Sequence, residues 1–310
     1  MREINTTHRI PLRIKMSRLS EKLGRKFVVT GEIAPPRGSN LAVFKQDLRS
    51  FKKIWKKLDA INVVDNPGSM MLMSSLACSI MLKQNNLEPV YQLTCRDRNL
   101  FALESDLVAA GAFGIENVLA LTGDHPKCYS SEHPNARGVY ELDSASLIRL
   151  LKNMNNGLDG CGRKLNAKTN FFIGAALAPG TKPIEPEIHK MQRKLLAGAR
   201  FFQTQAIFEP SVMENFLQKM EKTAGDQRKK IVMSIVPLYS YKMYELLVKI
   251  PGVIISEQTA LKIKNSENPV EEGVNQASIL IDKAKELGVA GVHLMPAGKM
   301  KAFIKLFEKI

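Results

Sequence analysis

A recurring local pattern limits the folds open to this chain more than any other feature. A helix-like stretch ends in glycine or another small residue, and a run rich in β-branched and aromatic residues follows and closes on a polar residue. Clear examples lie at 58–65, 110–124, 196–205 and 287–295. Glycine at the junction suits the C-cap of a helix. The pattern therefore predicts alternating helices and strands, as in an α/β protein.

Eight such apolar runs predict eight strands. They cover residues 27–34, 60–65, 89–95, 117–123, 170–177, 200–206, 231–237 and 290–295. Several are almost continuously apolar, which indicates parallel strands covered on both faces. Eight β-α units match a (β/α)8 barrel, which typically has about 250 residues. A doubly wound open sheet is the alternative, but no G-x-G-x-x-G motif follows the first strand and no P-loop motif occurs. We expect a single-domain α/β fold, a (β/α)8 TIM barrel.

Charge and composition bear on domain organisation. The chain has 45 Lys and Arg against 30 Asp and Glu, a formal net charge of +15, and 45% hydrophobic residues. That apolar share allows a large core and excludes intrinsic disorder. Residues 1–26 hold eight basic and two acidic side chains, a net charge of +6. We expect a short basic N-terminal extension over 1–26 and the barrel over 27–310.

Several classes of protein are excluded. One Trp, six Tyr and no aromatic stacking motif argue against nucleic-acid binding. No apolar run reaches the roughly 18 residues that span a bilayer, so we expect no membrane partner. Cys78, Cys95, Cys128 and Cys161 are far apart and the five histidines are scattered, so no metal site is expected. Reduced thiols are typical of a cytoplasmic protein.

Polar residues close the predicted strands, where barrels carry their chemistry. Glu32 lies inside the apolar first strand, where a carboxyl would hold its proton more readily and could act as a general acid. The alternatives for Glu32 are a partly exposed strand residue and a structural ion pair. Asp124 follows a Thr-Gly turn and should remain ionised. Two carboxylates in unlike settings suggest an acid and an electrostatic stabiliser, but these residues alone leave the reaction open.

Six segments, taken together, carry a family resemblance. They are G-E-I-A-P-P at 31–36, L-T-C-R-D-R-N at 93–99, A-L-T-G-D at 120–124, G-A-A at 174–176, Q-T-Q at 203–205 and I-V-P-L at 235–238. In this order and at this spacing they resemble the methylenetetrahydrofolate reductase family. The likeness is to the short bacterial reductases and to the reductase half of bifunctional homocysteine methyltransferase–reductase proteins.

The resemblance implies a flavin-bearing barrel of one-carbon metabolism and methionine biosynthesis. It would reduce 5,10-methylenetetrahydrofolate to 5-methyltetrahydrofolate in a ping-pong cycle, with electrons from NAD(P)H or from a partner protein. Glu32 would be the general acid that opens the five-membered ring. Asp124 would stabilise the resulting 5-iminium cation and contact the flavin. Gln205 would contact the pterin and the nicotinamide in turn.

Further site residues are implied by the same resemblance. The expected flavin contacts are Asp65, Gln92, Thr122, Gly123, Asp124 and Tyr140, with Arg193 and Lys194 at the pyrophosphate. Tyr241 and Lys299 would contact the folate. The segments 177–182 and 65–68 depart from the family pattern, which leaves FAD, the first expectation, and FMN both open, together with the electron donor.

Other functions and partners stay open. Another pterin-binding barrel of the folate–corrinoid methyltransferase type is one alternative, and a basic non-catalytic subunit of a larger complex is another. We expect a homo-oligomer or a complex with an electron-donor protein. The basic extension is a candidate to dock on an acidic donor, and the polar loop over 125–137 is a candidate lid or docking surface.

Overall fold

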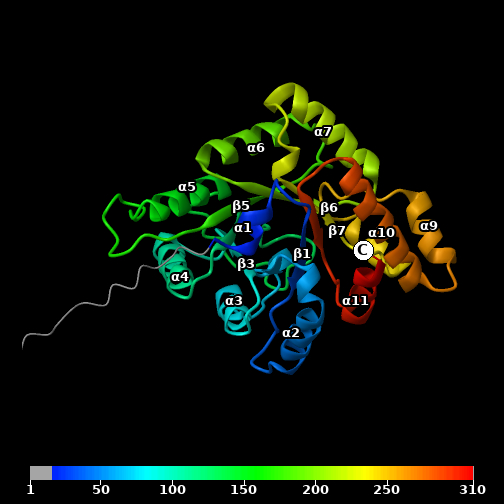
Figure 1. Cartoon of the computed structure of the whole chain (residues 1–310), viewed down its shortest axis with the longest axis horizontal. Helices are drawn as coiled ribbons and strands as arrows, with labels where there is room; N and C mark the ends of the chain where they lie inside the picture. Colours follow the sequence, from blue (N-terminus) through cyan, green and yellow to red (C-terminus); the bar gives the residue numbers. More distant parts are fainter. Residues whose placement is uncertain (1–15, 310) are drawn as a thin grey trace, which may run out of the picture.

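Eight parallel strands close into a barrel in the computed structural model, which describes residues 16–309. The strands are β1 (Val28–Ile33), β2 (Ala60–Val63), β3 (Pro89–Thr94), β4 (Asn117–Leu121), β5 (Phe172–Leu177), β6 (Phe201–Ala206), β7 (Ile231–Ile235) and β8 (Gly291–Leu294). Each strand pairs with the next, and β8 pairs with β1. The expected (β/α)8 barrel and all eight predicted strands are confirmed, and the open sheet is excluded (Figure 1).

Helices surround the barrel and connect consecutive strands. The connecting helices are α2 (Ala42–Ile54), α3 (Ser75–Gln84), α4 (Leu100–Ala112), α5 (Ser144–Asn155), α6 (Glu185–Ala197), α7 (Pro210–Ala224) and α10 (Pro269–Glu286), and α11 (Met300–Lys309) follows β8. Two shorter helices, α8 (Tyr241–Leu247) and α9 (Glu257–Asn265), precede α10. Single 3-10 turns are η1 (Trp55–Lys57), η2 (Pro67–Ser69) and η3 (Arg228–Lys230). Side-chain caps fix several helix starts; for example, Asn99 accepts a hydrogen bond from the backbone N–H of Ala102.

The core has an outer layer between strands and helices and an inner layer inside the barrel. In the outer layer, Phe51 and Phe303 pack edge to face with ring centroids 5.7 Å apart. A Cβ on Gly31 would lie 2.8 Å from the Phe51 ring, so glycine lets α2 approach β1 closely. Residues from strands all round the barrel fill the lower inner layer: Val28, Ala60, Val90, Leu119, Phe201 and Val232.

A short helix covers the N-terminal end of the barrel. In Figure 1, α1 (Arg18–Lys22) lies over the centre of the strand ring. Leu19 is fully buried in the inner layer, and Ser17 Oγ donates a 2.7 Å hydrogen bond to Asn117 Oδ1. Lys22 Nζ lies 2.6 Å from Asp59 Oδ1. Residues 17–22 of the expected basic extension are therefore packed against the barrel, whereas residues 1–15 lie outside the described part of the chain.

No helix within residues 16–309 is both long and apolar enough to cross a bilayer.

Candidate functional site

Two adjoining cavities open where the strands end. One has a volume of about 280 Å³ and the other about 300 Å³, and both are lined by Thr122, Ser144, Ala176 and Lys194. Together they have the size of a ligand site of roughly 300 to 1,000 Å³. The first cavity also includes Arg193 and Gln205. Of the other predicted residues, the second includes Asp65, Gln92, Gly123 and Asp124.

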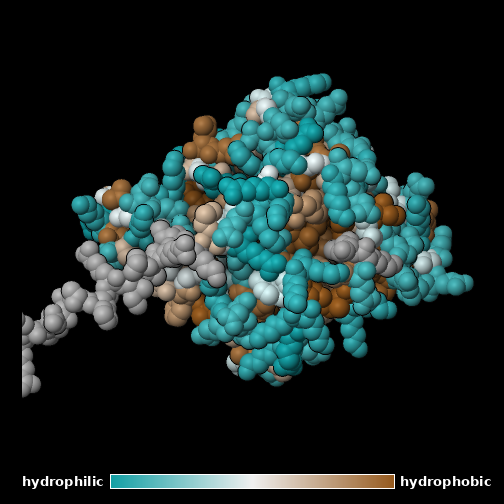
Figure 2. All heavy atoms as spheres, in the orientation of Figure 1, coloured by the Kyte–Doolittle hydropathy of each residue, from teal (hydrophilic) through white to brown (hydrophobic). Residues whose placement is uncertain are grey.

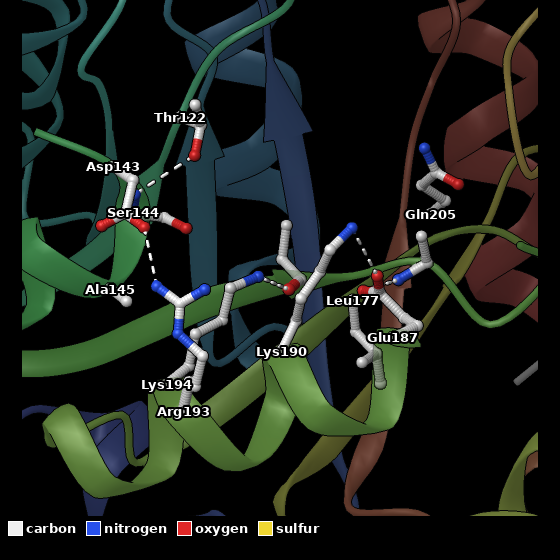
Figure 3. Close-up of a pocket in the computed structure, with 12 residues that line it drawn as sticks. Thr122, Asp143, Ser144, Ala145, Leu177, Glu187, Lys190, Arg193, Lys194 and Gln205 are labelled. Carbon is white, nitrogen blue, oxygen red and sulfur yellow. Dashed lines mark hydrogen bonds and ion pairs between the residues drawn. The ribbon is translucent and has the colours of Figure 1, made fainter. Parts of the chain in front are cut away.

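Three cations from α6 line the first cavity. Lys190, Arg193 and Lys194 are three or four positions apart, so they share one helix face (Figure 3). Lys194 Nζ donates a 2.7 Å hydrogen bond to the Ala176 carbonyl, and burial lowers the pKa of Lys194. Arg193 is exposed and pairs with Asp143 at 3.0 Å. The sequence predicted Arg193 and Lys194 but missed Lys190.

Glu187 joins the segment that follows β5 to the helix that carries these cations. Its buried carboxylate accepts a 2.9 Å hydrogen bond from the backbone N–H of Ala178 and lies 3.6 Å from Lys190 Nζ. The carboxylate thereby fixes the segment that follows β5 against α6. This segment is one of the two that depart from the family pattern.

Asp124 lies on the rim of the second cavity in a tight turn. Gly123 has φ +92°, and a Cβ there would lie 2.8 Å from Arg96 Cβ, so glycine is required. One carboxylate oxygen of Asp124 accepts a 2.9 Å hydrogen bond from the Gly68 N–H. The carboxylate is exposed and held in place, as an electrostatic group should be.

The sequence analysis did not identify Arg96, which braces this rim. Its guanidinium is buried and pairs with Asp97 at 2.7 Å. It also donates to the carbonyls of Asn66 and Asp124, at 3.0 and 3.3 Å. The loops after β2, β3 and β4 are thereby joined. The R-D-R sequence was noted only as part of the family resemblance.

Asp65 lines the second cavity, but its acceptor sites are filled from within the protein. Its carboxylate accepts from the N–H and hydroxyl of Thr94, both at 2.9 Å, and from Ser75 at 3.1 Å. Arg98 pairs with it at 2.7 Å and also reaches Asp106 at 2.9 Å. Asp65 therefore organises the ends of β2 and β3.

Glu32 belongs to a polar network inside the barrel. Its Oε2 lies 3.3 Å from Nε2 of the fully buried His293. His293 Nδ1 lies 3.0 Å from Thr30 Oγ1 and 3.1 Å from Asn62 Nδ2. Gln92 Nε2 approaches Asn62 Oδ1 at 3.5 Å. Glu32, with a side chain 22% exposed, thus lies between this network and the barrel mouth.

The network orients the imidazole ring of His293. Since Gln92 donates to the Asn62 carbonyl oxygen, the Asn62 amide nitrogen faces His293 and donates to Nδ1. In the tautomer with Nδ1 as the acceptor, the Nε2 proton points at Glu32. Neither Asn62 nor His293 was predicted, because each is a single polar residue within an apolar strand.

Gln205 lies at the opposite side of the first cavity from the α6 cations (Figure 3). Its Oε1 atom is buried and has no hydrogen-bond partner among residues 16–309. A Cβ on Gly252 would lie 2.6 Å from that oxygen, and a Cβ on Gly180 would lie 2.1 Å from the Gly252 carbonyl oxygen. Two glycines therefore let the loops after β5 and before α9 close beside Gln205.

Four predicted residues do not line either cavity: Glu32, Tyr140, Tyr241 and Lys299. Tyr140 lies at the rim, where its hydroxyl donates a 3.0 Å hydrogen bond to the Asp124 carbonyl. Tyr241 begins α8, with Lys264 Nζ 4.8 Å from its ring centroid. Lys299 is exposed just before α11. Tyr241 and Lys299 follow β7 and β8 respectively, so both belong to the same end of the barrel as the cavities.

The expected lid over 125–137 lies across neighbouring loops. Glu132 pairs with Arg37 after β1 and accepts a 3.4 Å hydrogen bond from the Met71 N–H. Ser130 Oγ donates to the Gly68 carbonyl at 2.9 Å. The segment therefore forms part of the rim.

The described residues offer little support for thiol or metal chemistry. Within residues 16–309, no three Asp, Glu, His or Cys side chains converge as metal ligands. All four cysteines are free, and burial raises the pKa of Cys78 and of Cys95 to about 12. These two thiols are therefore poor nucleophiles at neutral pH.

The donor set of the cavities fits a flavin nucleotide. Cations suited to phosphate lie at the α6 end of the first cavity. Amide and hydroxyl groups suited to a polar ring edge lie at Gln92, Thr94 and Thr122 in the second. The Oε1 atom of Gln205 is a buried hydrogen-bond acceptor without a partner in the described residues, and a donor group of a ligand could satisfy it.

Comparisons with known proteins give independent evidence about the family. A family model described as methylenetetrahydrofolate reductase matches residues 15–310. Methylenetetrahydrofolate reductase 2 of Schizosaccharomyces pombe is 25% identical over 230 residues, which are 69% of this chain and 33% of that protein. A probable methylenetetrahydrofolate reductase (NADPH) of Caenorhabditis elegans is 26% identical over 186 residues, 59% of this chain and 25% of that protein. The matched part is thus a third or less of each relative.

Two solved structures share the fold. An uncharacterized protein from Clostridium thermocellum, described as binding two copies of 5-methyl-5,6,7,8-tetrahydrofolic acid, has a TM-score of 0.65 at 15% identity. The alignment covers 93% of this chain and 97% of that chain. The 2,3-dimethylmalate lyase of the PEP mutase/isocitrate lyase superfamily has a TM-score of 0.50 at 10% identity, over 94% and 84% of the two chains.

Proposed function

Because the chain belongs to the methylenetetrahydrofolate reductase family, we propose that it reduces 5,10-methylenetetrahydrofolate to 5-methyltetrahydrofolate with a bound flavin. The observation that carries the proposal is the hydrogen-bonded pair of Glu32 and His293 inside the barrel. Asn62 links this pair to Gln92, which lines a two-part cavity with cations at one end. The folate ligand named for the Clostridium thermocellum protein supports the choice of substrate.

Glu32 is the general acid of this proposal. It protonates the nitrogen that leaves when the five-membered ring of the folate opens, which produces the 5-iminium cation. His293 keeps the Glu32 carboxyl oriented through the contact between its Nε2 and Oε2 of Glu32. Thr30, on the other ring nitrogen, holds the imidazole in place. The match to the reductase family model and to a reductase of Schizosaccharomyces pombe favours the reductase over the corrinoid alternative.

Asp124 and Gln205 act on the pterin. The fixed, exposed carboxylate of Asp124 stabilises the developing cation without having to reorganise. Gln205 receives a donor group of the pterin on its buried Oε1. Tyr241 and Lys299 cover the folate and hold its tail carboxylates, Lys299 as a point charge.

The flavin, FAD as the first expectation, would be held by residues of both cavities. Gln92, Thr122 and Gly123 contact the ring and ribityl region, and Lys194 with Arg193 neutralises the phosphates. Arg193, which pairs with Asp143, would be available to hold a phosphate oxygen. When bound and reduced, the flavin supplies the hydride. NAD(P)H or an electron-donor protein provides the electrons, in a cytoplasmic homo-oligomer or donor complex.

The visible spectrum of the purified protein tests this function. We expect a yellow protein with flavin absorbance that bleaches on reduction and recovers when methylenetetrahydrofolate is added. Mass analysis of the released cofactor distinguishes FAD from FMN. A colourless protein that neither binds added flavin nor converts the folate would overturn the proposal.

A further inference from the structure

The N-terminal face of the barrel has its own cavity, at the opposite end from the mouth. Its volume is about 250 Å³, and it opens between the loops that precede β1, β7 and β8. Four of its lining side chains are cations, and none of its lining residues is acidic: the cations are Arg25, Lys26, Lys229 and Lys285. Hydrophilic residues also gather over α1 on this face (Figure 2). The N-terminal face of such a barrel ordinarily serves stability, so a charged hollow there needs another explanation.

Backbone hydrogen bonds join the three loops into a rigid floor. The Val28 N–H donates to the Ala290 carbonyl at 3.0 Å. The Ala290 N–H in turn donates to the carbonyls of Arg228, at 3.1 Å, and Ile231, at 2.8 Å. The cavity is therefore formed before any ligand arrives, which lowers the entropic cost of binding.

Two glycines with positive φ lie beside Lys229 in this cavity. Gly24 has φ +76° and Gly288 has φ +70°. A Cβ on Gly24 would lie 3.2 Å from the Lys229 carbonyl oxygen, and a Cβ on Gly288 would lie 3.9 Å from Lys229 Nζ. Lys229 thus lies between the two glycine turns, both of which have a backbone conformation that favours glycine.

The cations in and around this cavity divide into paired and unpaired groups. Arg228 pairs with Glu221 at 2.7 Å and with Asp226 at 3.0 Å, and Lys285 pairs with Asp282 at 2.9 Å. Arg25, Lys26 and Lys229, by contrast, have no acidic partner within residues 16–309. Unpaired like charges around one hollow repel each other, and a bound anion removes that repulsion.

We propose that this cavity binds a small polyanion that bears phosphate groups. The Arg25 guanidinium suits bidentate contact with a phosphate, and the two lysines supply point charges around it. Phe27 also lines the cavity and offers an apolar surface to the organic part of such a ligand. The proposal is independent of the folate reaction, because the two sites lie at opposite ends of the barrel.

Calorimetric titration of the full chain with tripolyphosphate, at constant ionic strength, tests the site. We expect a binding step that weakens about tenfold or more in R25A/K26A/K229A, as the loss of charge-assisted hydrogen bonds implies. The matched control K45A/R49A/K53A removes the same charge from the exposed side of α2 and should leave this step unchanged. Lys229→Glu, a single exposed substitution, should reproduce the loss if the triple variant folds poorly.

A variant among the α6 cations of the first cavity provides the decisive comparison. In Lys194→Met, the titration step assigned to the N-terminal cavity should persist. The proposal is overturned if tripolyphosphate does not bind the wild-type chain, or if its binding disappears in Lys194→Met and persists in R25A/K26A/K229A. Equal weakening in the α2 control would also overturn it, because that result indicates an effect of net charge alone.

Discussion

His293 on β8 presents its Nε2 to Oε2 of Glu32 on β1, at a distance of 3.3 Å, across two strands that pair in parallel. Asn62 on β2 orients the imidazole from the other side at 3.1 Å. Three strands thus determine how the carboxyl of Glu32 is held. A carboxyl oriented in this way loses little entropy on reaching the reactive geometry, so its catalytic effect depends on the neighbours that hold it.

Substitution of Glu32 by Gln should separate the two half-reactions. The amide keeps the size of the side chain but cannot protonate the folate nitrogen, so folate reduction should fall by about 10² to 10⁴. Reduction of the flavin by its donor should remain close to wild type, because that step needs no acid. Stopped-flow absorbance measures each half-reaction separately. Equal damage to both would show that Glu32 is structural.

Substitution of His293 tests whether Glu32 acts alone. His293→Leu removes the Nε2 proton that faces the carboxyl, and we expect folate reduction to fall by roughly tenfold or more and its pH profile to shift. His293→Gln retains a donor and should recover part of the rate. A pH profile unchanged in both variants, with stability alone reduced, would assign His293 to packing.

The barrel could be predicted from the sequence because local patterns specify its strands. The run over 117–123 has a continuous apolar centre, V-L-A-L at 118–121, and follows a Gly-containing helix end. Such a pattern specifies a strand without knowledge of its neighbours. The structure places it as β4, between β3 and β5. Asp124, one residue beyond this run, could be placed at the mouth by the same logic.

The missing parts of the site depend on contacts between distant residues. Asn62 and His293 are 231 positions apart, and no local pattern indicates that they meet. The sequence also did not indicate that Arg96 is buried, because arginine side chains are usually exposed. The five-residue helix α1 is too short for an amphipathic period, so its basic residues indicated an extension while Leu19 went unnoticed.

Gly252→Ala should disturb Gln205 specifically. The residue has φ +83°, and the added Cβ would lie 2.6 Å from the buried Gln205 Oε1. We expect a stability loss of about 1 kcal/mol from the backbone conformation and, in addition, a raised KM for the folate. Gly225→Ala is the matched control, since Gly225 has φ +72° with nothing within 4 Å of its Cβ position. A KM raised equally in both variants would refute the contact.

Lys194→Met should weaken flavin binding without unfolding the protein. Burial lowers the pKa of Lys194, so its charge is costly in the folded state unless an anion lies nearby. We expect flavin affinity to fall about tenfold or more, with little loss in the free energy of unfolding. Flavin fluorescence titration and urea denaturation measure the two effects. Unchanged flavin affinity would remove Lys194 from the cofactor site.

Lys194 should also make the free energy of unfolding depend on pH. Unfolded Lys194 keeps its proton up to its ordinary pKa of 10.5, whereas the folded residue releases it at lower pH. Between these two values the unfolded state binds more protons, so the wild-type free energy of unfolding should rise with pH relative to Lys194→Met. A difference between the two proteins that is constant with pH across this alkaline window would contradict the lowered pKa.

Leu19→Ala tests whether α1 is part of the barrel. The side chain is fully buried among the inner-layer residues of the strands, so its truncation leaves a cavity that the closed barrel can fill only in part. We expect a loss of about 2 to 4 kcal/mol in the free energy of unfolding. Ile279→Ala on α10, where the side chain is 66% exposed, should cost less than about 0.5 kcal/mol. Since the mouth lies at the other end of the strands, flavin binding in folded Leu19→Ala should equal that of the wild type. A stability loss no larger than that of Ile279→Ala would mean that the barrel is complete without α1.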